Sequence, residues 1–157
     1  MRTFNLPMAR IAAGLVAGLL LLVATVGGAA AARPALILID IDLDSGTETF
    51  TTNSPLLCPF GSAYTDFHFG AGNFNRAGTF HLDKLMVCDD NSGTFVIGVN
   101  AGSNFVVGSG TTGGWFVVPG SGTDAYLGLQ GGGNVVGVNG DNDPIDLTDH
   151  YYGSLTL

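Results

Sequence analysis

Short apolar runs alternate with turns rich in glycine, asparagine and proline along most of the chain. In the first of these runs, Ile37, Ile39 and Ile41 share one parity, while Asp40 and Asp42 take the other. A period of two places successive side chains on opposite faces of a β-strand, so this run indicates a strand with one buried face. Comparable runs predict strands over 36–43, 48–52, 64–69, 79–88, 94–100, 105–107, 115–118, 125–129, 135–138 and 151–157, with a strand end at 56–58.

One parity of each run supplies the predicted core. The expected core residues of the central runs are Phe67, Phe69, Phe80, Leu82, Met86, Cys88, Phe95, Ile97 and Val99. The turns include a hairpin loop at 89–93 and a glycine break at 131–133. Outside residues 1–32, no window has the spacing of an amphipathic helix. The pattern therefore predicts an all-β fold, a single-domain antiparallel β-barrel of about eight strands, with a β-sandwich as the alternative.

Residues 1–32 have the organisation of a secretory signal peptide. Arg2 and Arg10 supply positive charge, an uncharged apolar run covers 11–26, and small residues at 29–32 are typical of a cleavage site. We expect cleavage before Arg33, which leaves a soluble domain over 33–157, secreted or held in the cell envelope. The alternative is a retained membrane anchor, because the apolar stretch approaches the ~20 residues that span a bilayer.

The predicted mature domain is strongly acidic. Arg33, Arg76 and Lys84 are its three strong bases against thirteen acidic residues, a net charge near −10. Nucleic acid and anionic membrane surfaces both recruit clustered lysine and arginine, so neither is an expected partner of the cleaved protein. The acidity suits solubility and the binding of cations or basic partners.

Cys58 and Cys88 are the two cysteines of the chain. In an oxidising compartment an isolated pair most simply forms one disulfide, here expected to stabilise the fold by about 3–4 kcal/mol in the chain-entropy treatment. The alternative is a reactive or metal-binding thiol pair, which the absence of CxxC spacing disfavours.

A glycine-rich stretch near the only tryptophan resembles known barrel proteins. Residues 122–126 (GTDAY), followed by Gly131 and Gly133, are similar to the glycine series of dirigent proteins and allene oxide cyclases. With the segment 88–95, the stretch also resembles small exported bacterial proteins that are similar to these barrels. The resemblance implies an eight-stranded antiparallel barrel with a central cavity. Asp124 stands where a second glycine is common, and no catalytic residue of the plant enzymes matches a position here, so architecture carries over without chemistry.

His68, His81, Asp66 and Asp83 form the most specific candidate constellation. If the runs 64–69 and 79–88 pair symmetrically as a hairpin, His68 lies opposite His81 and Asp66 opposite Asp83. Imidazoles with carboxylates could bind zinc or another divalent ion, or could act as acid–base pairs. The sequence favours the simpler interpretation of a solvated outer face, because the neighbouring aromatic residues take the opposite parity. We therefore predict neither a metal nor a cofactor.

The remaining loops carry no recognisable cofactor motif. The glycines at 131–133 lack the lysine and the following helix of a phosphate loop. The acidic turn at 141–144 lacks the closing glutamate of an EF-hand.

Aromatic side chains near the glycines are the candidate ligand-binding groups. Trp115, Phe116 and Tyr126 could stack on a sugar or an apolar ligand, and ordinary packing is the alternative. The expected function is a non-enzymatic binding or interaction module for a small apolar ligand or a cell-surface glycan. The alternatives are a lyase or isomerase of the allene oxide cyclase or dirigent type, and a structural protein of the envelope.

Overall fold

The computed structural model describes residues 31–42, 46–73, 77–103, 110–139 and 146–157. The strands are β1 (Arg33–Asp42), β2 (Thr47–Thr52), β3 (Phe60–Asn73), β4 (Ala77–Cys88), β5 (Thr94–Ser103), β6 (Thr111–Val117), β7 (Gln130–Asn139) and β8 (Asp146–Thr156), with a short 3-10 helix, η1 (Asp124–Tyr126), before β7. Residues 1–30 of the predicted signal peptide, the predicted strand 105–107 and the turn 141–144 lie outside the described residues. No helix in the described part of the chain is long and apolar enough to cross a membrane.

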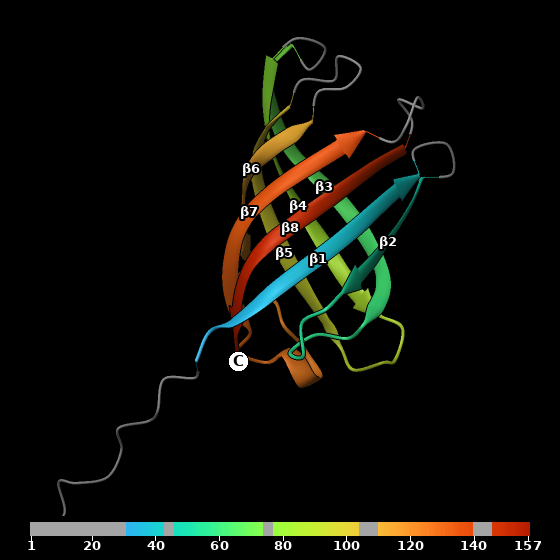
Figure 1. Cartoon of the computed structure of the whole chain (residues 1–157), viewed down its shortest axis with the longest axis vertical. Helices are drawn as coiled ribbons and strands as arrows, with labels where there is room; N and C mark the ends of the chain where they lie inside the picture. The colour runs from blue at the N-terminus through green and yellow to red at the C-terminus, as the bar shows by residue number, and fades with distance from the viewer. Residues whose placement is uncertain (1–30, 43–45, 74–76, 104–109, 140–145) are drawn as a thin grey trace, which may run out of the picture.

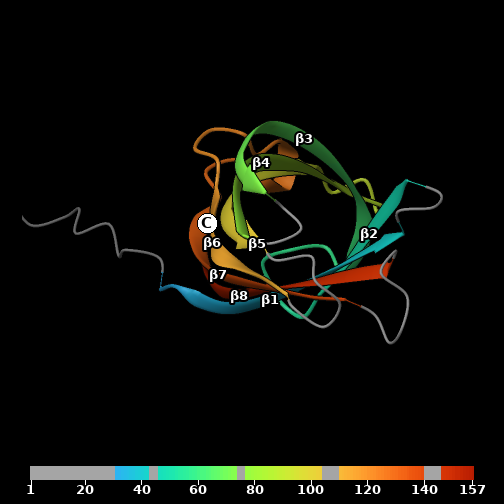
Figure 2. The ribbon, with the colours of Figure 1, turned by 90° about the horizontal axis from the view of Figure 1, so that it is seen from above.

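The strands form a closed antiparallel barrel. Each strand is hydrogen-bonded to the next one in sequence, and β8 pairs with β1 to complete the ring (Figures 1 and 2). Closure gives every strand a paired neighbour on both sides, which removes most of the exposed edges that invite aggregation. The predicted barrel of about eight strands is confirmed, and the sandwich alternative is excluded.

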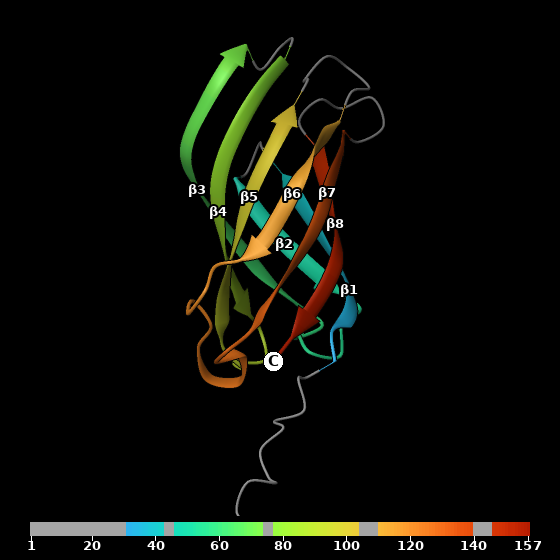
Figure 3. The ribbon, with the colours of Figure 1, turned by 90° about the vertical axis from the view of Figure 1, so that its left-hand side faces the viewer.

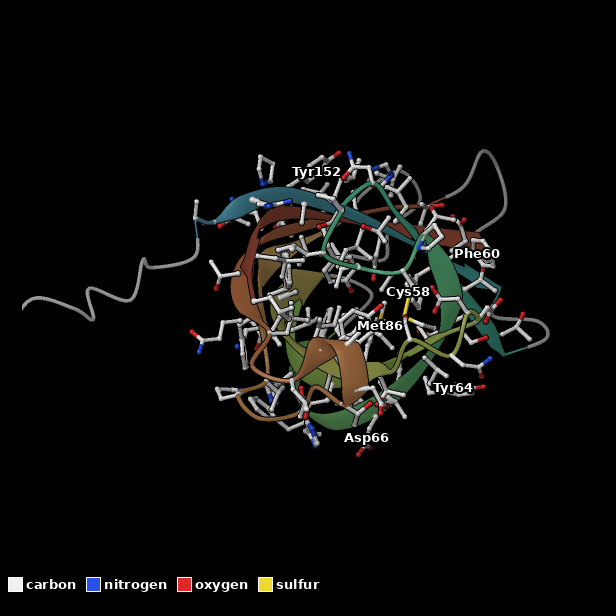
Figure 4. The ribbon with its side chains drawn as sticks, turned by 90° about the horizontal axis from the view of Figure 1, so that it is seen from below. Cys58, Phe60, Tyr64, Asp66, Met86 and Tyr152 are labelled. Atoms are coloured by element: carbon white, nitrogen blue, oxygen red, sulfur yellow. A yellow bond between two sulfur atoms is a disulfide. The ribbon has the colours of Figure 1, made fainter. Side chains whose placement is uncertain are left out.

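The core lies inside this ring and follows the predicted parity on most strands. Ile37 and Ile39 of β1 are fully buried, and the register pairs them with Tyr151 and Asp149 of β8. The inward side chains of the central strands include Met86, Cys88, Phe95, Ile97, Val99, Trp115, Val117 and Val135, all of them buried. Figure 4, which looks along the barrel from below, shows Met86 inside the ring and Tyr64 and Tyr152 outside it.

One end of the barrel is plugged by η1, and we call it the plugged end. Tyr126 of η1 is buried, and its hydroxyl accepts a hydrogen bond from the Cys58 backbone N–H at 2.9 Å and pairs with Ser92 Oγ at 2.7 Å. At the other end β1, β3, β5 and β7 end and β2, β4, β6 and β8 begin, and we call it the hairpin end (Figure 1).

The predicted disulfide between Cys58 and Cys88 is confirmed. It joins the β2–β3 connection to the end of β4, and its two Cα atoms are 5.9 Å apart. Both cysteines are buried beside Tyr126 at the plugged end. Because both sulfur atoms are used in the bond, the alternative of a metal-binding thiol pair is wrong.

The prediction of a strand over 125–129 is wrong. These residues form η1 and a turn, in which Tyr126 and Leu129 are both buried. A separation of three residues between buried side chains fits a helical turn, whereas strand alternation would place them on opposite faces. Asp124 begins this turn with φ +51°, in the left-handed region that aspartate tolerates better than most residues.

Three further predictions need correction. Residues 56–58 form turns, so they are no strand end, and the glycines 131–133 lie within β7 instead of breaking the chain. The stretch 70–78, left between the predicted strands 64–69 and 79–88, is largely strand as well, because β3 continues to Asn73 and β4 begins at Ala77.

Phe67 and Phe69 were expected in the core, and both are exposed. The register of β3 and β4 shifts between these two residues, which turns Phe69 to the outer face opposite His81. Phe67 keeps the inward parity, opposite the buried Leu82, but it is 52 % exposed. Figure 3 shows β3 and β4 reaching far toward the hairpin end, and among the described residues β2 pairs with β3 only over 60–63, which leaves this part of β3 less covered.

Candidate functional site

Polar side chains of four strands meet inside the barrel, and we call them the interior polar cluster. The members are Glu48 of β2, Thr65 of β3, Lys84 of β4, and Asp149 and Tyr151 of β8. Each of these side chains faces the interior of the barrel. The register indicates this, because each residue is paired with one whose side chain lies on the same inner face as the core. On β4, Lys84 lies between the buried core residues Leu82 and Met86, so the cluster interrupts the apolar core.

Lys84 is the centre of the first half of the cluster. Its side chain is 2 % exposed, and its Nζ donates to Glu48 Oε2 at 2.5 Å and to Thr65 Oγ1 at 2.6 Å. Thr65 in turn donates to Glu48 Oε1 at 2.6 Å, so the three groups form a closed ring of hydrogen bonds. Thr65 is exposed and Glu48 is partly exposed, which gives the buried ammonium a polar connection to solvent.

Asp149 and Tyr151 form the second half. The Tyr151 hydroxyl donates to Asp149 Oδ2 at 3.1 Å. Asp149 is 7 % exposed, and its Oδ1 is the buried side-chain atom that has no hydrogen-bond partner among the described residues. Gly137 of β7 makes room for this carboxylate, because a Cβ at that position would lie 2.5 Å from Asp149 Oδ1.

The two halves interact electrostatically across the barrel. Burial raises the pKa of Asp149, and the attraction of the Lys84 ammonium opposes that rise. Burial also raises the pKa of Tyr151 well above its usual value, with a further contribution from Asp149. Tyr151 therefore stays a neutral phenol that donates to the carboxylate. Among the described residues, Lys84 forms its ion pair with Glu48. No ion pair within 4.0 Å joins the Lys84 ammonium to the Asp149 carboxylate in this part of the chain.

Sequence analysis missed this cluster, although one signal was present. Lys84 lies on the same parity as Leu82 and Met86, in the middle of the longest predicted apolar face. A lysine is almost never fully buried unless it is paired. That single position could have prompted a search for inward-facing carboxylates on other strands.

The second group of polar side chains lies on the outer face of β3 and β4. Asp66 is paired with Asp83 in the register, as predicted, but His81 is paired with Phe69, so the predicted pairing of His68 with His81 is wrong. His68 instead occupies the register shift. Its Nε2 still lies 2.9 Å from Asp83 Oδ2, and its ring stacks on that of His81 at a centroid distance of 5.2 Å.

The outer group is accessible to solvent. The hydrogen bond with Asp83 raises the pKa of His68, and the negative charges of Asp83 and Asp66 add to that rise. One nitrogen or oxygen atom from each of His68, His81 and Asp83 can be chosen so that all three lie within 4.8 Å of one another. Two imidazoles and a carboxylate are a ligand set that suits a transition ion.

The three aromatic residues proposed as ligand-binding groups lie in different surroundings. Trp115 is 3 % exposed and donates from Nε1 to the Tyr152 backbone oxygen at 3.1 Å, and Tyr126 is part of the plug. Phe116 lies on the outer face, where its ring covers Gly98. Their role in ligand binding stays a prediction, and Phe116 is the most exposed of the three.

A groove of about 220 Å³ lies on the outside of the barrel, away from both polar groups. It runs along β1 and β2 and is lined by Leu36, Leu38, Thr51, Thr52 and Asn53. None of these side chains is ionisable. The groove therefore offers apolar contact and hydroxyl groups without acid–base chemistry.

Comparison of the chain with protein-family models, with curated proteins and with solved structures found no match. The similarity to dirigent proteins and allene oxide cyclases stays a prediction from the sequence.

The raised pKa of Asp149 predicts a pH-dependent effect of Asp149→Asn. Since the folded state holds the proton more tightly than the unfolded state, ionisation of Asp149 lowers stability as the pH rises from 3.8 through the folded pKa. Asparagine does not ionise, so Asp149→Asn does not lose stability in this way. We expect its free energy of unfolding, relative to the wild type, to increase across this pH window in urea titrations.

Asp90→Asn is the matched control, with the opposite sign. Asp90 Oδ1 accepts a hydrogen bond from the Ser92 backbone N–H at 2.9 Å, and the hydrogen bonds with Ser92 lower its pKa below 3.8. Its contribution to stability is present above pH 3.8 and disappears as the pH falls through the folded pKa. The relative stability of Asp90→Asn should therefore decrease as the pH rises. A decrease in the relative stability of Asp149→Asn with rising pH would contradict the assignment for Asp149, and an increase for Asp90→Asn would contradict the assignment for Asp90.

Proposed function

We propose that this protein is a binding protein that takes a small neutral ligand with several hydroxyl groups, such as the end of a saccharide, at the hairpin end of the barrel. The observation that carries this proposal is the buried Asp149 Oδ1, which has no hydrogen-bond partner among the described residues, near a buried ammonium. A buried acceptor without a partner costs about 1–3 kcal/mol, which a ligand that supplies a donor can recover.

A hydroxyl group fits both halves of the interior polar cluster. The Lys84 ammonium has three hydrogens, and the hydrogen bonds to Glu48 and Thr65 use two of them. A hydroxyl can accept a hydrogen bond from the third hydrogen and donate its own hydrogen to Asp149 Oδ1. Groups that only accept, such as a ketone or an ether, cannot serve the carboxylate in this way.

An aromatic pair lies on the inward parity of the strands that carry Thr65 and Lys84. The rings of Phe67 and Phe80 have centroids 6.3 Å apart and are tilted by 32°. Phe67 is two residues beyond Thr65 on the same face of β3 and is largely exposed. A sugar ring offers an apolar C–H face to such aromatic groups and hydroxyls to the polar groups below them.

The cluster favours this ligand over the other classes considered. A purely apolar ligand would leave the buried Asp149 Oδ1 without a hydrogen-bond donor and would cover the partly exposed Glu48 carboxylate, which is costly. An anionic ligand would meet a chain with a net charge of −8. A neutral polyhydroxylated ligand avoids both costs, so the glycan alternative is favoured over the apolar ligand.

One observation favours the alternative of a lyase or isomerase. A carboxyl group whose pKa is raised by burial, next to a neutral tyrosine, is an arrangement that can donate and accept protons. The alternative would require turnover of a bound ligand. Binding without chemical change of the ligand would separate the two functions.

The test is a nuclear magnetic resonance titration of the isotope-labelled mature protein with methyl glycosides of glucose, galactose, mannose, arabinose and N-acetylglucosamine. We expect at least one of them to shift amide signals of β3, β4 and β8 near the interior polar cluster. Phe67→Ala and Asp149→Asn should each weaken that binding tenfold or more, which corresponds to about 1.4 kcal/mol.

Phe60→Ala is the control for this test. Phe60 is 53 % exposed and begins β3, the strand of Phe67, at the plugged end. The substitution Phe60→Ala therefore removes a similar aromatic side chain far from the proposed site. Its affinity should equal that of the wild type. The proposal fails if no glycoside binds, or if Phe60→Ala weakens binding as much as Phe67→Ala does.

A further inference from the structure

We propose that the outer face of β3 and β4 holds a binding site for a divalent transition ion, with zinc as the best-suited metal, formed by His68, His81 and Asp83. This site is separate from the interior polar cluster and does not depend on the proposed saccharide binding. Its ligands come from two neighbouring strands of one hairpin.

The register shift in β3 brings the first ligand into place. Phe67 is paired with Leu82 and Phe69 with His81, so His68 is the extra residue between two consecutive pairs. A β-bulge of this kind bends the strand and redirects a side chain. His68 Nε2 lies 2.9 Å from Asp83 Oδ2, which shows that the redirected imidazole faces the carboxylate of the neighbouring strand.

Asn100 of β5 orients the second ligand. His81 Nδ1 lies 2.8 Å from Asn100 Oδ1, and an amide oxygen can only accept a hydrogen bond. Nδ1 therefore carries the hydrogen, and the lone pair of His81 is on Nε2. Metal-binding histidines almost always donate the hydrogen of their other nitrogen to such a partner, which fixes the tautomer and the ring orientation.

The His81 ring also contacts two other rings. It stacks on His68 at a centroid distance of 5.2 Å and on Phe69 at 5.8 Å. Asn100, His68 and Phe69 thus all restrain the imidazole. A restrained ring loses less rotational freedom when it binds an ion, so the site is partly organised in advance.

The separations suit a small ion with short bonds. The three ligand atoms lie within 4.8 Å of one another, and tetrahedral zinc with bonds of about 2.0–2.1 Å needs separations of roughly 3.3 Å. A small rotation of the exposed His68 and the partly exposed Asp83 side chains would close this difference. Two imidazoles and a carboxylate supply three of four tetrahedral positions and leave one for water or a partner's side chain. Asp66, paired with Asp83, adds negative charge beside the site.

The test is a zinc titration of the untagged mature protein, followed by competition with a chromogenic chelator at pH 7. The wild type should bind one zinc ion per chain at this site. His68→Ala, His81→Ala and Asp83→Asn should each weaken that binding at least tenfold. All three side chains lie on the outer face, so circular dichroism and melting temperature should confirm that the variants fold.

Two further variants make the outcome specific. His150 lies on the outer face of β8, where it stacks on Tyr152, and His150→Ala should leave zinc affinity unchanged. Asn100→Ala retains all three ligands and should weaken affinity 10–100-fold while preserving the stoichiometry. The proposal is overturned if zinc does not bind, or if His68→Ala and His81→Ala bind it as tightly as His150→Ala does.

Discussion

Replacing Lys84 with methionine is expected to lower the free energy of unfolding by about 3 kcal/mol, the cost of leaving one partner of a buried ion pair behind. The side chain of Lys84 is buried and holds Glu48 and Thr65 by hydrogen bonds of 2.5 Å and 2.6 Å. Without the ammonium, the Glu48 and Asp149 carboxylates remain in the barrel with no positive charge between them. Chemical denaturation with urea measures the loss.

Two variants serve as controls for this result. The double variant Lys84→Met with Glu48→Gln removes both charges, and it should recover part of the loss because neutral replacements of a buried pair are often tolerated. Arg33→Met removes a positive charge from an exposed side chain and should change stability by about 0.5 kcal/mol or less. If Lys84→Met were no more destabilising than Arg33→Met, Lys84 would not hold the interior polar cluster together.

Replacing Gly133 with alanine should be comparably costly, at about 3 kcal/mol, because β7 and β8 lie too close together for a side chain at this position. A Cβ on Gly133 would lie 1.9 Å from the Tyr152 backbone oxygen and 2.6 Å from the Gly153 Cα atom. Neither contact can be relieved by rotating a side chain, so the two strands must separate. Thermal and urea denaturation report the effect.

Gly114→Ala is the matched control on the neighbouring strand. A Cβ on Gly114 would meet only the Gly133 backbone oxygen, at the ordinary contact distance of 3.5 Å. Alanine restricts the unfolded chain more than glycine does, so this variant should be neutral or slightly stabilising. Equal destabilisation by both alanines would show that loss of any glycine matters, and the close approach of β7 and β8 at Gly133 would not be the cause.

The alternation of apolar and polar residues predicted most of the barrel because each strand has one buried face. Ile37, Ile39, Phe95, Ile97 and Val99 all face the interior as their parity requires. Alternation in the sequence does not reveal a β-bulge, however, since one extra residue moves every later side chain of the strand to the opposite face. That is why Phe69 is on the outer face, contrary to the expectation from the run 64–69.

Composition misled the prediction at the plugged end. Residues 125–129 look like a short apolar strand, but Tyr126 turns inward to bind the Cys58 backbone and Ser92. These partners are far away in sequence, so no local pattern reveals them. The glycines at 131–133 look like a turn, yet they lie within β7, where Gly133 is in close contact with β8.

The candidate sites differ in how far the sequence could predict them. The outer group depends on the pairing of two adjacent strands, and the sequence brought His68, His81 and Asp83 together even though one pairing was wrong. The interior polar cluster joins side chains of β2, β3, β4 and β8. Glu48 and Asp149 are far apart in the sequence, and they come into one cluster only when β8 pairs with β1 and closes the barrel. Such a cluster depends on the whole topology of the barrel. In the sequence it was indicated only by Lys84, which alternates in step with apolar residues that face the core.

The binding account depends most on the state of Asp149, and a carbon-13 titration of its side-chain carboxyl measures that state directly. The account predicts a midpoint above the ordinary 3.8 in the free protein, because burial raises the pKa. It also predicts that the carboxyl signal shifts when a binding glycoside is added at constant pH. A midpoint at or below 3.8, with a signal unaffected by every glycoside tested, would contradict it.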